Sequence, residues 1–294
     1  MPADAARMDE LTRILAQFDA DAQLALRRLR TLNSCDPAGF ARLALAHLGG
    51  GGTGPAERGL AQLLTPSREY MRLLTDPDSF SVAEARAAAA IMARVDHGFH
   101  GKLLEMQHTG EAHRTLRILE IMGRDERSIA MTPWLRKLVD DHNPQVASKA
   151  AMVLSWLTRN PMAVGRFLQS SDARVRANAV EGLWGGRIEN TRGVLRAAAG
   201  DSHHRVAANA LVELCRCGDP VGREKIEELA CHADPRFRGA IAWAIGEIGD
   251  PRLLPIVRAL ECDPNLKVRL RAGRTAKRLL GAAAGAIAPP PTQA

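Results

Sequence analysis

DPRFRGAIAWAIGEIGDPRLLPIVRALECDP, residues 234–264, contains the pair Asp-Pro three times, at 234, 250 and 263. Asp is favoured at the N-cap of a helix, and Pro is tolerated in the first helical turn. Gly249 directly precedes the second pair, and Gly suits the left-handed position that follows a helix. The stretch therefore predicts two helices joined by Gly-Asp-Pro, with the next helical pair beginning at its end.

The same pattern recurs along the second half of the chain. Matching apolar residues follow one another at separations of 29, 31, 31 and 31 residues, and we call them the anchors: Val146, Val175, Val206, Phe237 and Val268. Apolar residues also follow each anchor four and eight positions later, which places all three on one face of a helix. A helical hairpin with one apolar face cannot bury that face alone, so we expect consecutive hairpins to stack into a solenoid.

The repeated sequence Asp-Pro-x-Val-Arg-x-x-Ala-x-x-x-Leu-x-x-x-Gly-Asp-Pro resembles a HEAT repeat. The similarity is to the short, regular bacterial type that is also found in bilin lyase subunits. Four segments carry the pattern best: Asp172–Leu183, Asp201–Pro220, Asp234–Pro251 and Asp263–Ala276. The resemblance implies an all-α fold, an alpha-alpha superhelix in which residues 141–280 form a right-handed solenoid of regular HEAT repeats. It says little about function, because one fold hosts many functions.

The remainder of the chain is less regular. Apolar residues at helical spacing predict N-terminal cap helices over residues 1–32, since a solenoid needs atypical elements to cover its end. Weaker copies of the hairpin pattern predict divergent helical repeats over residues 33–140. The glycine run at 49–54 lacks the Lys-Ser/Thr of a phosphate-binding loop, so we interpret it as a linker. Residues 281–294 are expected to form a disordered tail.

Composition narrows the class of protein. Aromatic residues make up only 4% of the 294 residues, and strand-like alternation is hard to find, which favours helices. No apolar stretch reaches the roughly 18 residues that a membrane span needs, and no signal peptide is recognisable, so we expect a soluble, cytoplasmic protein. The formal net charge of +7 allows an acidic protein partner or nucleic acid without choosing between them.

The five cysteines and nine histidines show no metal-binding spacing. Neither Cys-x-x-Cys nor a His pair at ligand spacing occurs, so we expect no metal and no cofactor. Cys231 and Cys262 occupy the same place in adjacent repeats, and we interpret them as small core thiols. His203 and His204 are interpreted as a loop pair at the start of a helix.

In HEAT repeats the helix that begins at the anchor lines the concave side, so the resemblance directs attention to the exposed face of these helices. Opposite the anchors, this face is small and apolar until the last repeat. It is predicted to be either core, or a semi-apolar groove for a partner helix or an extended peptide, because Trp anchors many interfaces. The groove residues would be Met152, Trp156, Glu181, Trp184 and Trp243.

Positive charge concentrates near the last repeat. Arg176, Arg238 and Arg269 each directly follow an anchor, and they are expected either to rim the groove or to bond neighbouring helix ends and loops. The final predicted helix carries cations with no acid between them. They are interpreted either as the solvated face of a cap or as a patch that binds nucleic acid or an acidic protein. The whole predicted basic patch is Arg176, Arg238, Lys267, Arg269, Arg271, Arg274, Lys277 and Arg278.

These features favour a non-catalytic scaffold or adaptor that binds a protein or peptide, for which an acidic partner is one option. The alternative is a nucleic-acid-binding HEAT protein. HEAT-like DNA alkylpurine glycosylases use tryptophans, an acidic residue and basic residues, and the chain has residues of these types: Trp184, Trp243, Glu181 and Arg238. No motif of that family can be laid on this chain, and a bilin lyase role would rest on the repeat type alone. We therefore expect no enzyme activity.

Overall fold

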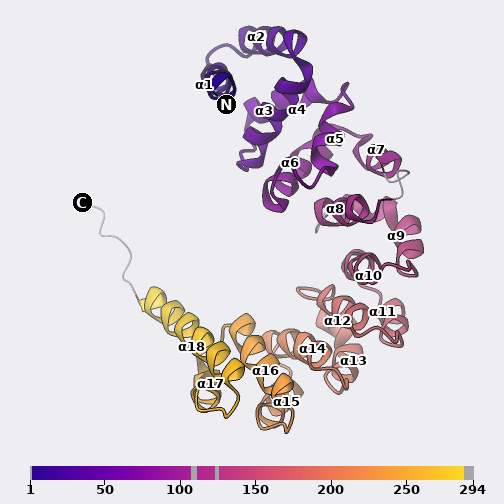
Figure 1. The fold of residues 1–294 in the computed structure, drawn as a ribbon, viewed down its shortest axis with the longest axis vertical. Helices are drawn as coiled ribbons and strands as arrows, with labels where there is room; N and C mark the ends of the chain where they lie inside the picture. The colour runs from indigo at the N-terminus through magenta and orange to yellow at the C-terminus, as the bar shows by residue number, and fades with distance from the viewer. Residues whose placement is uncertain (1, 107–110, 123–125, 288–294) are drawn as a thin grey trace. The chain divides into compact units, whose positions relative to one another are not determined.

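The computed structural model describes residues 2–106, 111–122 and 126–287 (Figure 1). Every regular element in these ranges is a helix, so the predicted all-α class is confirmed. No described helix is both long and apolar enough to cross a membrane. The chain divides into two compact units, Met1–Val146 and Ala147–Ala294, and we describe each by itself.

The first unit is built from short helices that pack against one another. The helix α3 packs against α6, and α6 packs against α8, while α1 and α2 pack on each other and on α3. The elements are α1 (Pro2–Ala16), α2 (Ala22–Cys35), α3 (Pro37–Gly49), α4 (Pro55–Leu64), α5 (Glu69–Thr75), α6 (Val82–Val95), α7 (Phe99–Met106), α8 (Ala112–Met122), the 3₁₀ helix η2 (Glu126–Met131) and α9 (Thr132–Leu138).

A buried polar cluster ties α5 to α7 within the first unit. Tyr70 is fully buried, and its hydroxyl donates a hydrogen bond to the carboxylate of Asp96. The ammonium group of Lys102 donates to the same carboxylate at 2.6 Å and to the carbonyl of Thr65 at 2.8 Å. A buried carboxylate is tolerated here because its oxygens accept several hydrogen bonds.

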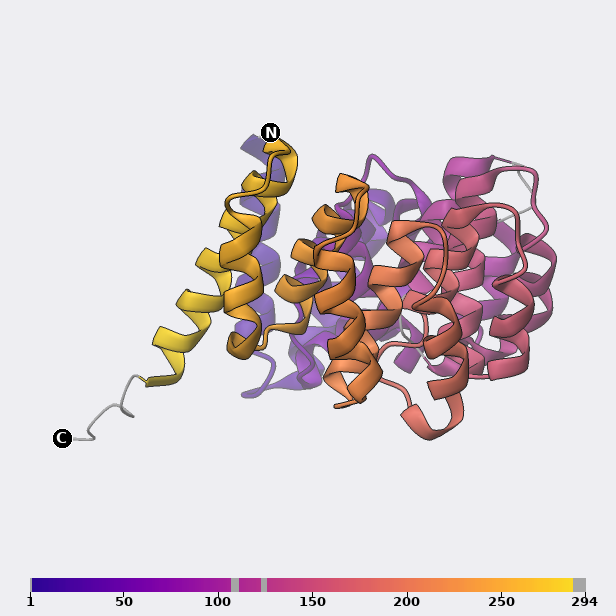
Figure 2. The ribbon, with the colours of Figure 1, turned by 90° about the horizontal axis from the view of Figure 1, so that it is seen from below.

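The second unit contains the regular repeats. Its helices form two layers, with α12, α14, α16 and α18 in one layer and their partner helices in the other (Figure 1). The orange-to-yellow helices at the end of this unit lie side by side in Figure 2 as well. The elements are α10 (Pro144–Thr158), α11 (Pro161–Phe167), α12 (Ala173–Glu181), α13 (Ile188–Ala198), α14 (His204–Arg216), α15 (Pro220–Ala230), α16 (Pro235–Ile248), the 3₁₀ helix η3 (Pro251–Leu253), α17 (Leu254–Leu260) and α18 (Leu266–Ile287).

The anchor pattern identifies the core of these repeats correctly. Each anchor lies on α10, α12, α14, α16 or α18, which we call the anchor helices. The residues four and eight positions after each anchor are buried without exception: Ala150, Ala179, Ala210, Ile241, Ala272, Leu154, Leu183, Leu214, Ile245 and Ala276. The anchors are buried too, apart from the half-buried Phe237. The 31-residue spacing therefore positions equivalent side chains against equivalent partners.

The predicted helix caps are present, with one difference. Asp219 and Asp234 are N-caps whose side chains accept a hydrogen bond from the backbone, and Gly249 ends α16 with a left-handed φ of 74°. The third Asp-Pro pair does not start its helix in this way. Asn265 accepts the backbone N–H of Lys267 at the start of α18, and the carboxylate of Asp263 accepts the backbone N–H of Asn265 just before that helix.

The face opposite the anchors is mostly buried, because neighbouring anchor helices pack side by side. Contacts run from α12 to α14, from α14 to α16 and from α16 to α18. Small residues permit this approach: a Cβ added at Gly246 would lie 3.0 Å from the hydroxyl of Thr275 on the next anchor helix. The predicted face is thus core over much of its width. On α18, which ends the described repeats, Leu270 is 58% exposed.

The end of the chain differs from the expected tail. The helix α18 continues to Ile287, so it runs past position 281, where the tail was predicted to begin. Residues 288–294, the rest of that prediction, lie outside the described residues.

Candidate functional site

Two of the three tryptophans predicted for the groove are stacked on each other. The ring centroids of Trp184 and Trp243 lie 6.2 Å apart, with an angle of 27° between the rings. Both side chains are half-buried, and they pack on a cluster of small residues from α14 and α16: Ala208, Val212, Ala240 and Ala244. The tryptophans are therefore partly core and partly surface.

Trp184 is the more constrained of the two rings. Its indole N–H donates a hydrogen bond to the carbonyl of Asn209 at 2.9 Å. The guanidinium carbon of Arg216 lies 5.2 Å from the ring centroid, within cation–π range. The polar edge and one face of Trp184 are thus engaged within the unit, so Trp243 has the greater freedom to meet a ligand.

Trp243 lines a recess of about 380 Å³, which we call the tryptophan hollow. The anchor helices α12, α14, α16 and α18 all contribute to its walls. The lining residues are Glu181, His204, Arg205, Ala208, Asn209, Ala240, Trp243 and Arg271. The recess thus combines an aromatic ring and two alanines with side chains that can donate or accept hydrogen bonds.

A second recess of about 320 Å³, the lysine hollow, adjoins the first. Its walls come from the first turns of α14, α16 and α18 and from the loop before α18. The lining residues are His204, Pro235, Arg236, Gly239, Asn265, Lys267, Val268 and Arg271. Because His204 and Arg271 line both recesses, the two form one continuous depression, which we call the groove.

Cations outnumber acids in the groove. Arg205, Lys267 and Arg271 take part in none of the ion pairs found among the described residues, although Arg271 donates a hydrogen bond to the carbonyl of Gly239 at 3.2 Å. Arg236 lies 2.6 Å from its own capping residue, Asp234. Glu181 is the acidic residue that lines the groove. The local field is therefore positive.

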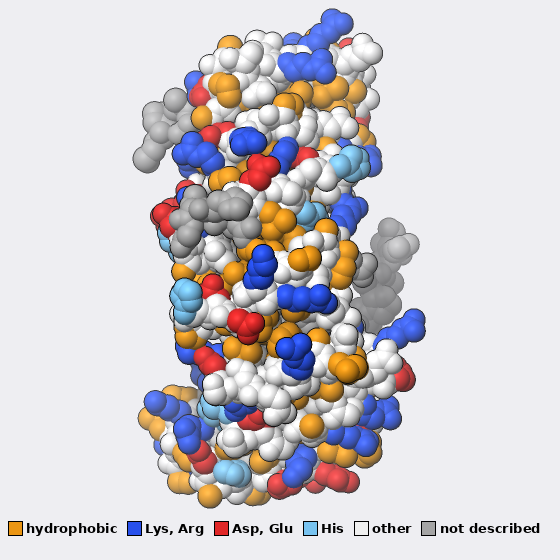
Figure 3. Space-filling model, turned by 90° about the vertical axis from the view of Figure 1, so that its right-hand side faces the viewer, with side chains coloured by type: hydrophobic (Ala, Val, Ile, Leu, Met, Phe, Trp, Pro, Cys, Tyr) orange, Lys and Arg blue, Asp and Glu red, His pale blue; other side chains and the backbone are white. Residues whose placement is uncertain are grey.

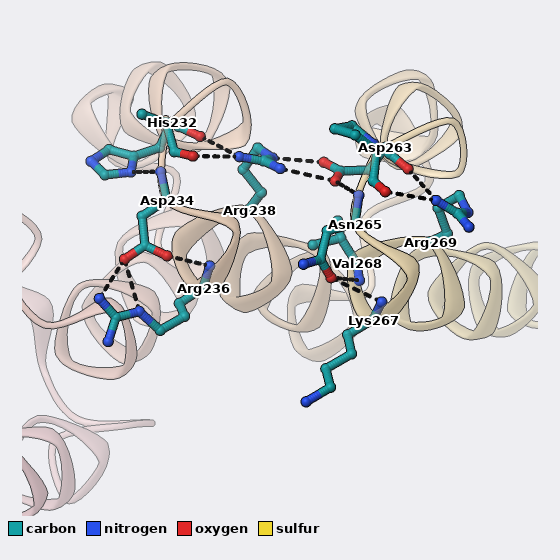
Figure 4. Close-up of polar contacts among 11 residues, drawn as sticks. His232, Asp234, Arg236, Arg238, Asp263, Asn265, Lys267, Val268 and Arg269 are labelled. Atoms are coloured by element: carbon teal, nitrogen blue, oxygen red, sulfur yellow. Dashed lines mark hydrogen bonds and ion pairs between the residues drawn. The ribbon is translucent and has the colours of Figure 1, made fainter.

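Two of the predicted basic residues are instead part of a lateral ladder (Figure 4). Arg238 donates to both oxygens of Asp263 at 2.6 and 2.9 Å, and to the carbonyls of His232 and Ala233. Arg176 binds Asp201 and the carbonyls of Ser170 and Ser171 in the same way. These guanidiniums join consecutive repeats and are not free to bind a ligand.

The ladder alternates along the unit. Asp201 and Asp263 accept an arginine from the preceding repeat, whereas Asp172 and Asp234 bind the arginine two positions later in their own repeat. The cause is in the sequence, because the position after the anchor is arginine at 176 and 238 but alanine at 147 and 207. Equivalent residues such as Asp172 and Asp234 are 62 apart, which is two repeats.

Comparison with known families bears on this region. A family model described as HEAT repeats matches residues 191–277. These residues form HEAT repeats. The matched HEAT repeats include α14, α16 and the first half of α18, and hence most of the residues that line the groove.

Several solved structures are similar to this chain. Human deoxyhypusine hydroxylase in complex with glycerol shares 16% identity, with 95% of this chain and 98% of that chain covered and a TM-score of 0.32. A structure of the Pds5–Scc1 complex shares 11%, with 87% and 52% covered and a TM-score of 0.38. A designed armadillo repeat protein in complex with the peptide (KR)4 shares 16%, with 86% and 98% covered and a TM-score of 0.26. No curated protein sequence matches.

The other predicted groove residues lie apart from the groove. Met152 and Trp156 are on α10, which contributes no residue to either hollow. Trp156 is half-buried, with the guanidinium carbon of Arg159 at 5.6 Å from its ring centroid. Of the predicted groove residues, Glu181 and Trp243 therefore line the groove, whereas Trp184 stacks on Trp243 without lining either hollow, and Met152 and Trp156 lie elsewhere.

The remaining cations of the predicted patch differ in the groups that they bond. Arg269 donates to the carbonyls of Asp263 and Pro264, and Arg278 pairs with Glu247 at 2.8 Å. Arg274 and Lys277 are exposed on α18 and line neither hollow. The groove therefore retains Lys267 and Arg271 from the predicted patch.

His204, Arg205, Asn209 and Arg236 line the groove, although the sequence did not single them out for it. His203 is the N-cap of α14, and His204 opens that helix with its ring 6.1 Å from Phe237. Asn209 is buried and donates to the carbonyl of Ala177 on α12 at 2.9 Å. Asn209 and Arg271 each lie three positions after an anchor. A polar residue at this position could have indicated from the sequence that they line the groove.

The cysteines are not core thiols. Cys231 and Cys262 are both exposed, because each lies in the loop that follows the second helix of its repeat. Cys215 is half-buried, and burial raises the pKa of its thiol to about 11. Within the described ranges, no group of three or more His, Cys, Asp or Glu side chains could hold a metal ion.

Proposed function

We propose that the second unit is a non-catalytic binding module that holds a peptide segment of a protein partner in the groove. The observation that carries this proposal is the tryptophan hollow. There, a half-buried aromatic ring and small apolar residues lie beside polar side chains on four neighbouring helices. Peptide sites have this composition, since an apolar anchor supplies affinity and polar groups fix orientation.

The shape of the groove suits an extended or helical segment more than a small molecule. The two hollows open side by side across the anchor helices α14, α16 and α18. A ligand that fills both would contact Trp243 in one recess and Lys267 in the other, with Arg271 between them. A chain of several residues meets this requirement without a closed pocket.

The glycosylase-like set of residues is only partly assembled. Glu181 and Trp243 line the tryptophan hollow, but Arg238 is held by Asp263 in the ladder. General acid–base chemistry needs the participating groups within hydrogen-bond reach of the same reacting atom. The arrangement therefore favours binding over catalysis.

Nucleic acid is the second candidate, and the net charge of +7 is what favours it. On the face drawn in Figure 3, Lys and Arg side chains are dispersed among acidic and uncharged ones. Non-specific DNA binding gains its affinity from many phosphate contacts made together. The dispersed cations of that face suit this mode of binding poorly.

Selection from a random peptide library on the immobilised full chain tests the proposal. We expect enriched peptides whose affinity falls by at least about tenfold on Trp243→Ala, because an aromatic anchor is lost. Trp156→Ala is the matched control, since it removes a second half-buried tryptophan from an anchor helix outside the groove.

Melting temperatures of both variants must be measured alongside. Trp243 packs on the alanine cluster, so Trp243→Ala is expected to cost about 2 kcal/mol of stability while leaving the chain folded at low temperature. If no peptide is enriched, or if the two variants lower affinity equally, the groove is not the binding site.

A further inference from the structure

We propose that the partner segment is acidic: a carboxylate of the peptide occupies the lysine hollow while an adjacent apolar side chain contacts Trp243. This inference rests on the proposed function and specifies its ligand. It follows from the charges in the groove that have no counter-charge.

The lysine hollow has a net positive lining. Lys267, Arg236 and Arg271 line it, and no carboxylate side chain does. Arg236 is balanced by Asp234, which leaves Lys267 and Arg271 as the uncompensated charges. Figure 4 shows Arg236 and Lys267 on the same side of the row formed by Arg238 and Asp263. A carboxylate in this hollow would supply the counter-charge that Lys267 and Arg271 lack.

Arg271 lies between the proposed site for the carboxylate of the ligand and the proposed site for its apolar side chain. It borders both hollows, and it donates to the carbonyl of Gly239 at 3.2 Å through one terminal nitrogen. That bond leaves the other N–H groups of the exposed guanidinium able to bind a carboxylate. Because Trp243 lines the adjoining hollow, the acidic residue and the apolar residue of the ligand must be close in its sequence.

The polar residues between the two recesses suit the backbone of a peptide. Burial, together with the charges of His203 and Arg236, lowers the pKa of His204, so its imidazole is neutral at pH 7 and can both donate and accept. Glu181 accepts a long hydrogen bond from Asn209 and offers further acceptor positions to peptide N–H groups. An extended chain supplies such groups along its length.

Glu181 also argues against nucleic acid as the occupant. A phosphate backbone that followed the groove from Lys267 towards Trp243 would bring negative charge beside this carboxylate. A peptide can present its acid at one end and a neutral backbone at the other. The distribution of charge along the groove therefore favours a segment with localised negative charge.

Two synthetic peptide pools test the inference against the full chain. Both carry Leu, Phe and Trp at random positions, and they differ only in whether the charged positions hold Asp and Glu or Lys and Arg. We expect the acidic pool to bind more tightly by at least about tenfold at physiological salt. Lys267→Glu and Arg271→Glu should each weaken it by about tenfold, and the double variant should prefer the basic pool.

The matched control is Arg223→Glu, which reverses a 54% exposed arginine on α15, in the other layer of helices. It should leave the affinity for the acidic pool unchanged. Arg271→Ala provides a second variant with a smaller perturbation, and circular dichroism confirms that each variant is folded.

Each outcome decides a separate point. Equal binding of both pools, lost in Trp243→Ala, overturns the charge inference and leaves the proposed function standing. Absence of binding by either pool overturns both. Single-stranded and duplex DNA are the remaining probes: if DNA binds and Arg271→Glu abolishes that binding, the occupant is nucleic acid and the inference is wrong.

Discussion

Arg238 illustrates how one side chain can join two repeats. Its guanidinium binds both oxygens of Asp263 in the next repeat and two carbonyls of the loop before its own helix. Bidentate pairs of this kind have a fixed geometry, so they set the lateral spacing of the helices as well as adding stability. The side chain is 13% exposed and the carboxylate 4%, which limits screening by salt.

Replacing one ladder carboxylate should destabilise the second unit. Asp263→Asn removes the counter-charge of Arg238, and we expect the free energy of unfolding to fall by about 1–3 kcal/mol in urea denaturation. The control is Asp250→Asn, because Asp250 pairs with the 82% exposed Arg252 and Asn is also a good N-cap. Its effect should stay within about 0.5 kcal/mol. Equal effects would show that the ladder adds no stability.

The ladder also makes stability depend on pH. Hydrogen bonds from Arg238 lower the pKa of Asp263. Burial raises the pKa of Asp201, but the hydrogen bonds from Arg176 and from the backbone N–H of His203, together with the charge of Arg176, outweigh burial and leave that pKa lowered as well. Both carboxylates therefore hold fewer protons in the folded state than in the unfolded state. Their contribution is complete above the ordinary Asp pKa of 3.8 and is lost as the pH falls through the lower folded values.

Urea midpoints measured between neutral and acidic pH check this dependence. We expect the midpoint to fall below about pH 4. In Asp263→Asn the fall should be shallower, because one of the titrating groups is gone. A variant that follows the same curve as the parent would contradict the assignment.

At the scale of the helix, the sequence predicts one face well and another poorly. The anchors and the residues four and eight positions later are core, since period and burial coincide on one face. For the opposite face the sequence left core and a semi-apolar groove as alternatives, and Ala177, Ala208 and Ala242 are buried on it. Helical periodicity does not show which helices will pack side by side. The many small residues on this face were the sequence feature that indicated close packing between helices.

The close approach of α12 to α10 gives a test at this scale. A Cβ added at Gly182 would lie 2.3 Å from the carbonyl oxygen of Met152, which is backbone and cannot move aside cheaply. We expect Gly182→Ala to lower the free energy of unfolding by about 1–3 kcal/mol.

Gly193→Ala serves as the control for this substitution. No atom lies within 4 Å of the position that its Cβ would take on α13. Alanine favours helix over glycine by about 1 kcal/mol, so this variant should be as stable as the parent or more stable. Thermal melts of both variants measure the difference, and a stable Gly182→Ala would contradict the described contact.

The candidate site was predictable only in part. Trp184 and Trp243 were identified from their positions, and the structure stacks them. Met152 and Trp156 lie outside the groove, because a residue's place in its repeat does not tell which repeats enclose a recess. His204 belongs to the first turn of its helix, where residues from three repeats meet, and that meeting depends on the lateral offset between helices.

At the scale of the whole molecule, a substitution in one unit is expected to destabilise mainly the helices of that unit. Stacked repeats gain stability from contacts between neighbours, so damage spreads mainly to adjacent helices. In the first unit, Asp96 holds Tyr70 of α5 and Lys102 of α7. Asp96→Asn should therefore raise amide hydrogen exchange in α5 and α7.

Hydrogen exchange followed by mass spectrometry measures this response. Exchange in α14, α16 and α18 should be unchanged in Asp96→Asn, and Asp263→Asn should give the reverse pattern. A uniform rise in exchange over the whole chain would show that the units unfold as one.

The alternation of the ladder has a consequence for temperature. Arginine–aspartate pairs join α12 to the start of α14 and α16 to the start of α18, but Ala207 leaves the junction of α14 and α16 without one. Apart from the hydrogen bond that Arg216 donates to the carbonyl of Glu247, that junction depends on the tryptophans and the alanine cluster, and apolar burial weakens on cooling. The groove spans the same junction, so we expect the protein to hold its ligand less tightly in the cold.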